Sequence, residues 1–113
     1  MAIKTKSVYE GEDKGEGRRL LIMRIWPRGI PKTRFDEWDK ELAPSPQLLK
    51  KWLNKSIPFE KFRSGYIKEM ESQKERIKTL AKRAKKETIT LFCHETEDAY
   101  CHRKMLKELI QRC

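Results

Sequence analysis

The chain has 113 residues, a length typical of one domain, so we expect residues 1–113 to form a single domain. Its 27 Lys and Arg against 17 Asp and Glu give a net charge of +10, which favours anionic partners such as phosphate esters, nucleotides or nucleic acid. Three Trp, three Tyr and four Phe argue against disorder. No apolar run approaches the roughly 18 residues of a membrane span, and the first residues lack a signal peptide's apolar stretch. We therefore expect a cytoplasmic protein with no membrane partner.

Two short strands are predicted near the start of the chain. Residues 3–8 alternate between apolar and polar side chains, and residues 20–25 are almost continuously apolar. The glycines between them fit a turn, because neither of the phosphate-binding patterns GxxxxGK[ST] and GxGxxG is present. The first part of the chain is therefore interpreted as strand, turn, strand.

A stiff basic loop follows the second strand. Two prolines and a glycine between Trp26 and Pro31 exclude regular structure over most of this stretch. We predict that Arg28 binds an anion, with Arg24 contributing, because the residues on either side of Arg28 fix its backbone. The alternative is a structural arginine that pairs with a loop carbonyl or with Asp36.

The middle of the chain is predicted to be helical. A short helix is expected over residues 35–42, and the next helix carries apolar residues at 48–53. Helical spacing then runs over residues 59–84, as one bent helix or two successive ones. Five basic residues at 78–86 could contact phosphates, or could form a solvated helix end.

Residues 88–93 (TITLFC) are β-branched and apolar, which predicts a buried central strand, and a final helix is expected from about Tyr100. This order predicts an α/β fold with a small, mostly parallel sheet flanked by helices and a long helical insertion between strands. Parallel strands place the loops after residues 25 and 92 at the same carboxyl edge, where open α/β sheets bind ligands.

The loop after the last strand gathers two of the three Cys and both His within residues 93–102. Its sequence, CHETEDAYCHR, resembles the C-x-E then C-H-R signature of the YeaO-like family, domain of unknown function 488. The resemblance extends to WPRG at 26–29, LAPS at 42–45, and Phe62 with Tyr66. It implies an α/β fold and a functional site, but no defined reaction. The site residues that it implies are Cys101, His102 and Arg103, with Cys93 and Glu95 upstream.

The same residues can be assigned chemical roles. Cys101 is predicted beside the N-terminus of the last helix, where backbone N–H groups and the helix dipole lower the pKa of a thiol. His102 could act as a base and Arg103 could bind an oxyanion. Glu95, at the position of the family's acid, could serve as a general acid or base. The alternative is a small apolar Cys101 packed under the helix, with His102 and Arg103 pairing with nearby acids.

The two cysteines allow two further interpretations. Cys93, His94, Cys101 and His102 are of the types that hold tetrahedral zinc, although zinc sites commonly use CxxC or HxxxH spacings. Cys93 could instead be a resolving thiol for Cys101. The sequence therefore assigns no metal ligand and no cofactor.

The leading hypothesis is an anion-binding site at the Cys-His-Arg loop for a phosphorylated or nucleotide-like ligand, with a thiol-dependent catalytic step. One alternative is a basic nucleic-acid-binding module without catalysis, which rests on charge alone. Another is a structural zinc site at the Cys-His cluster. The sequence does not predict an oligomeric state.

Overall fold

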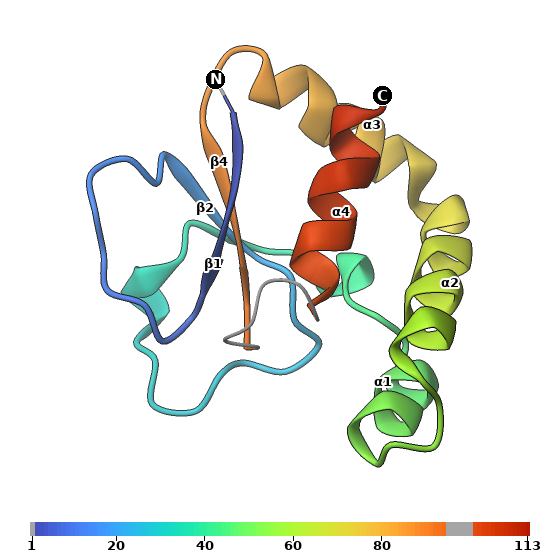
Figure 1. Cartoon of the computed structure of the whole chain (residues 1–113). Coiled ribbons are helices and arrows are strands. Elements are labelled where there is room, and N and C mark those ends of the chain that lie inside the picture. The colour runs from blue at the N-terminus through green and yellow to red at the C-terminus, as the bar shows by residue number, and fades with distance from the viewer. Residues whose placement is uncertain (1, 95–100) are drawn as a thin grey trace.

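A computed structural model of the chain describes residues 2–94 and 101–113. Four parallel strands form one sheet in the order β1-β4-β2-β3 (Figure 1). The strands are β1 (Ile3–Ser7), β2 (Arg18–Leu21), β3 (Glu37–Trp38) and β4 (Ile89–Cys93). The sequence prediction of an α/β fold with a small parallel sheet is confirmed.

β4 is the central strand of the main three-strand part of the sheet. It pairs with β1 from Ile3↔Ile89 to Ser7↔Cys93, and with β2 from Arg18↔Ile89 to Leu21↔Phe92. All five of its residues are buried, as expected for an apolar strand covered on both faces. Its position places Cys93 at the carboxyl edge of the sheet.

The helices lie on one side of the sheet (Figure 1). They are α1 (Pro46–Leu53), α2 (Phe59–Met70), α3 (Lys74–Ala84) and α4 (His102–Gln111). The 3-10 turn η3 (Glu71–Gln73) separates α2 from α3, so the predicted long helical stretch is two successive helices. Between the helices and the sheet lies the larger apolar core, which includes Leu91, Tyr66 and Leu106. α4 packs on β1 and β4 and also contacts α2 and α3.

A smaller apolar cluster covers the other face of the sheet. Val8, Leu21, Phe35 and Phe92 are its buried members, and the loop after β2 adds Met23, Trp26 and Ile30. No helix α1–α4 contributes a residue to this cluster. One face of the sheet is therefore covered by helices and the other by loops.

The predicted helix over residues 35–42 is wrong. This stretch contains β3 and the 3-10 turn η2 (Lys40–Leu42). The backbone N–H of Asp36 donates to Arg19 O and that of Asp39 to Leu21 O, so pairing with β2 takes the backbone bonds that a helix would use. A buried Phe35 side chain on the loop-covered face adds tertiary packing that outweighs the local helical pattern.

The second strand begins and ends earlier than predicted, because β2 spans Arg18–Leu21 and not residues 20–25. β1 and β2 do not pair with each other, because both run parallel to β4 and β4 lies between them. Residues 8–17 instead return the chain to the start of the sheet. Gly17 is required there, because its φ is +62° and a Cβ atom would lie 2.2 Å from Thr88 O.

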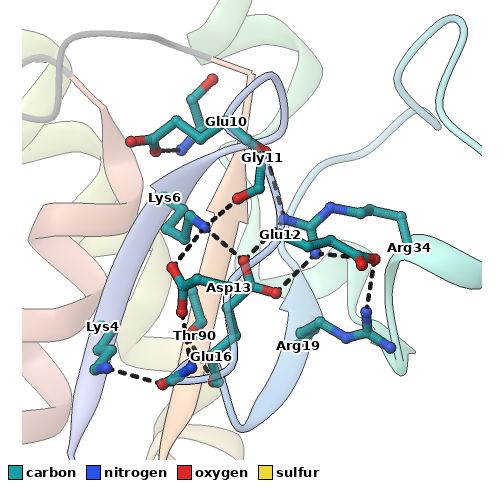
Figure 2. A network of polar contacts seen from close by, with 12 residues as sticks. Lys4, Lys6, Glu10, Gly11, Glu12, Asp13, Glu16, Arg19, Arg34 and Thr90 are labelled. Carbon is teal, nitrogen blue, oxygen red and sulfur yellow. Dashed lines mark hydrogen bonds and ion pairs between the residues drawn. The ribbon is translucent and has the colours of Figure 1, made fainter.

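A buried carboxylate holds this return segment against the sheet (Figure 2). Glu16 accepts hydrogen bonds from Arg34 at 2.8 and 2.9 Å and from Lys6 Nζ at 2.6 Å. The hydroxyl of Thr90, on β4, donates to Glu16 O at 2.6 Å. The Arg34 guanidinium also lies 4.7 Å from the centroid of the Phe92 ring. The network therefore links β1, β4 and the turn η1 (Lys32–Arg34) through one residue.

Replacing Arg34 by Ala should remove both guanidinium hydrogen bonds from the buried Glu16 carboxylate and leave Lys6 as its remaining cation. We expect Arg34→Ala to lower the free energy of unfolding by about 3–5 kcal/mol, measured by urea unfolding. The matched control is Arg76→Ala, since Arg76 makes a 3.0 Å ion pair with Asp39 on a half-exposed side chain. The control should cost less than about 1 kcal/mol. Equal losses in the two variants would contradict a special role for the buried pair.

Glu16 also couples stability to pH. Burial by itself raises the pKa of Glu16, but the hydrogen bonds from Arg34 and Lys6 outweigh burial and bring the pKa below its ordinary value of 4.5. A carboxylate with a lowered pKa stabilises the fold fully above the ordinary value, and that contribution is lost as the pH falls through the native value.

The free energy of unfolding should therefore decrease as the solution is acidified below about pH 4.5. Glu16→Gln should unfold more easily at neutral pH and show a shallower loss on acidification, because one of the linked protons is gone. Urea unfolding on both sides of pH 4.5 measures both slopes. Identical slopes for the wild type and the variant would rule out Glu16 as a source of the acid sensitivity.

Candidate functional site

Cys93 ends β4 and points to the helix-covered face of the sheet. Side chains alternate along a strand, and Ile89 and Leu91, on the same side as Cys93, belong to the larger core beneath the helices. The Cys93 side chain is therefore set at the carboxyl edge, between the sheet and the helices.

Cys101 and His102 approach the same place from the start of α4. Cys101 is the N-cap residue, with an extended backbone and no side-chain capping hydrogen bond, and His102 is the first helical residue. The relative exposures of Cys93, Cys101 and His102 are 5, 2 and 6%. α4 packs on β1 and β4, and the first two residues of this helix, His102 and Arg103, are buried.

The three side chains converge on one imidazole nitrogen. Cys93 Sγ lies 3.5 Å from His102 Nδ1, and Cys101 Sγ lies 3.8 Å from the same atom. One donor atom from each residue falls within 4.8 Å of the other two. The structure thus brings together three of the five predicted catalytic residues.

A backbone carbonyl fixes the orientation of the imidazole. His102 Nε2 lies 2.6 Å from Ile22 O, just beyond the end of β2. A carbonyl oxygen can only accept, so Nε2 carries the proton and donates, and in the neutral ring Nδ1 keeps its lone pair. That lone pair faces the two sulfur atoms.

Tyr66 packs beside this imidazole. Its ring centroid is 5.5 Å from that of His102, and its hydroxyl donates to Leu42 O at 2.7 Å. Burial raises the pKa of Tyr66 well above its ordinary value of 10.0, so the side chain is a neutral phenol at neutral pH. The family resemblance includes Tyr66, but the sequence predicts no contact between Tyr66 and the site.

The thiol of Cys101 is protonated in this environment. Burial is the main cause that raises its pKa, and a hydrogen bond with Cys93 adds to the rise, while His102 opposes it. The sequence prediction relied on the helix N-terminus to lower this pKa, but desolvation outweighs that effect. An activated Cys101 thiolate remains a prediction that the pKa direction does not favour.

The remaining predicted site residues lie elsewhere or outside the described part. Glu95 is not among the described residues. Arg103 is 2% exposed in the first turn of α4. Arg24 Nε donates to Pro44 O at 3.1 Å, so Arg24 ties two loops together. Arg28 is exposed.

His94 and the basic residues of α3 also have defined positions. His94 is exposed, and its ring stands edge-on to Tyr9 at 5.6 Å, away from the buried cluster. In the basic segment 78–86, Arg83 bonds to Glu37 through Nη1 and Nη2 at 3.1 and 2.6 Å. Part of that positive charge therefore fastens α3 to β3 instead of remaining available to phosphates.

Similarity to known proteins identifies the family. The model of the family DUF488-N3a, described as the active DUF488-N3 subclade, matches residues 3–113. The chain belongs to this family. Uncharacterized protein YeaO of Escherichia coli is 35% identical over 113 residues, which cover 98% of each chain. The predicted YeaO-like membership is confirmed.

Two mycobacterial proteins are similar over a shorter stretch. Uncharacterized proteins Rv3073c of Mycobacterium tuberculosis and Mb3100c of Mycobacterium bovis are each 37% identical over 70 residues, or 60% of this chain and 59% of theirs. No solved structure matches the chain significantly. The DUF488-N3a match includes β4 and α4, which position the Cys-His cluster. Within residues 2–94 and 101–113, no helix has both the length and the apolar character of a membrane span.

Proposed function

We propose that this protein binds a thiophilic divalent metal ion, zinc first, through Cys93, Cys101 and His102. The observation that carries the proposal is the convergence of two sulfur atoms and one imidazole nitrogen within 4.8 Å in a buried site. Thiolate and imidazole are the preferred ligands of zinc. A sequence spacing that is unusual for zinc is compatible with this geometry, because the end of a strand and the start of a helix supply the ligands.

The distances suit tetrahedral coordination. Zn–S bonds of about 2.3 Å and Zn–N bonds of about 2.0–2.1 Å, at the tetrahedral angle, separate sulfur from nitrogen by about 3.5–3.6 Å. The separations from His102 Nδ1 are 3.5 Å for Cys93 and 3.8 Å for Cys101. Both sulfur–nitrogen separations are therefore within a few tenths of an ångström of those in a tetrahedral site.

The second nitrogen of His102 supports the same role. A histidine that binds a metal through one nitrogen usually donates a hydrogen bond from the other, which fixes the tautomer and the ring orientation. The bond from Nε2 to Ile22 O supplies this contact and leaves Nδ1 for the metal.

Charge balance also suits a buried site. Two thiolates and one Zn²⁺ carry no net charge, so the complex avoids the large cost of burying an isolated ion. Without metal, the raised pKa keeps the Cys101 thiol neutral, and metal binding must displace its proton. The proposal requires reduced thiols, as in the cytoplasm predicted from the sequence.

A thiol nucleophile is the second candidate function. Its supporting observation is the contact of Cys93 Sγ with His102 Nδ1 at 3.5 Å, with Ile22 O orienting the imidazole, which is the arrangement of a nucleophile, a base and an orienting group. The word "active" in the family description is compatible with a site that does chemistry. In this candidate the predicted phosphorylated or nucleotide-like ligand would require Arg103 or Arg28 as its anion-binding group.

Zinc affinity tests the leading proposal. Competition between the reduced full chain and a chromophoric chelator should give about one Zn²⁺ per chain. Cys101→Ser and Cys93→Ser should each weaken zinc binding by more than about tenfold, because each removes one of the thiolates that would bind the metal directly. The control is Cys113→Ser, since Cys113 is exposed at the other end of α4. Unchanged zinc affinity in both site variants, with far-UV circular dichroism preserved, would overturn the proposal.

Cysteine labelling separates the two candidates. With zinc bound, iodoacetamide should label Cys93 and Cys101 slowly, and a chelator should accelerate both while leaving exposed Cys113 unchanged. Peptide mass spectrometry resolves the three sites. A chelator-independent reaction at Cys93 or Cys101, at a pH below that needed for Cys113, would instead support the nucleophile.

A further inference from the structure

A second concave site lies away from the Cys-His cluster. A cavity of about 420 Å³ is lined by Trp26, Lys32, Phe35, Asp36, Glu37 and Trp38. Trp26 and Phe35 belong to the loop-covered face of the sheet, whereas Cys93 points to the helix-covered face. The cavity is therefore separated from the candidate metal centre by the sheet itself. Its size falls in the range of small-molecule pockets.

Three aromatic rings form its apolar surface. Trp26 stands edge-on to Phe35, with centroids 5.4 Å apart, and edge-on to Trp38 at 5.3 Å. The Trp26 indole N–H donates to Ile30 O at 2.7 Å, and that of Trp38 donates to Met23 O at 2.6 Å. These bonds fix the two indoles and occupy their donors, so the rings present an apolar surface to the cavity.

The two acids that line the cavity are already neutralised. Asp36 accepts from the guanidinium and the backbone N–H of Arg19, with distances of 2.8 to 3.3 Å. Glu37 accepts from Arg18 at 2.9 Å and from Arg83 at 2.6 and 3.1 Å. Both carboxylates are thus paired with arginines.

Positive charge at the cavity remains uncompensated. Lys32 is exposed and has no ion-pair partner among the described residues. Lys40 Nζ lies 4.3 Å from the centroid of the Trp38 ring, where it adds a second positive charge next to the aromatic wall. Both ammonium groups would repel a cationic ligand and attract an anionic one. The chain's net charge of +10 acts in the same direction.

We infer that this cavity binds a mononucleotide, whose base packs against the aromatic rings of Trp26 and Trp38 while its phosphate pairs with Lys32. A nucleotide joins in one molecule the two features that the site selects, a flat ring and a negative charge. Neither feature depends on metal at the Cys-His cluster, so this site and the proposed metal function can fail separately.

Tryptophan fluorescence of the full chain, titrated with AMP, adenosine, inorganic phosphate and choline, tests the inference. AMP should give a saturable change, with affinity at least about tenfold above that of adenosine or phosphate alone. Isothermal titration calorimetry then provides a signal independent of the tryptophans. Tighter binding of choline than of AMP, or no saturable binding of AMP, would overturn the assignment.

Two variants locate the binding. Lys32→Ala should reduce AMP affinity to that of adenosine and leave adenosine binding unchanged, and Trp38→Leu should weaken both ligands. The matched control is Lys51→Ala, an exposed lysine on α1, which should bind AMP as the wild type does. Cys101→Ser should also retain AMP binding. If neither Lys32→Ala nor Trp38→Leu alters AMP affinity, AMP binds elsewhere and the inference is wrong.

Discussion

The burial of β4 between two parallel neighbours is the constraint on which the rest of the structure depends. Pairing with β1 and β2 satisfies the backbone of β4 on both edges, which allows all five of its residues to be buried. The same pairing fixes Cys93 opposite Ser7 at the carboxyl edge. α4 packs on β1 and β4, and its start lies at this edge, where Cys101 and His102 are beside Cys93. The Cys-His cluster is thus a consequence of strand order.

The two faces of the sheet are held by different interactions. Apolar packing under the helices holds one face, while the other combines a small aromatic cluster with the Glu16 network. A buried carboxylate with two cations gives little net stability compared with an apolar core, but it specifies where the return segment lies. The arginines at the β3 edge act similarly, because they form ion pairs with Asp36 and Glu37. Among the described residues, Lys32 has no ion-pair partner.

Periodicity in the sequence predicted the elements whose local pattern and tertiary packing agree. TITLFC is buried as the central strand, and the spacing of Phe62, Tyr66 and Met70 buries one face of α2. The prediction failed over residues 35–42, where Phe35 is anchored on the loop-covered face and β2 supplies backbone partners. The sequence also left the strand order open, since no local pattern shows that a strand more than sixty residues later is inserted between β1 and β2.

The sequence by itself determined the fold class, the family and the gathering of Cys and His residues in one loop. Residue types and local spacing are sufficient for these, because each depends on short-range pattern. Only the tertiary structure decided which donors meet. It placed His94 against Tyr9, outside the cluster, and buried the Cys101 thiol enough to raise its pKa. It also oriented the His102 imidazole through the hydrogen bond to Ile22 O. The backbone carbonyl that orients His102 is eighty positions away, so no local sequence pattern predicts this contact. Desolvation of the Cys101 thiol depends on all the atoms that pack around it.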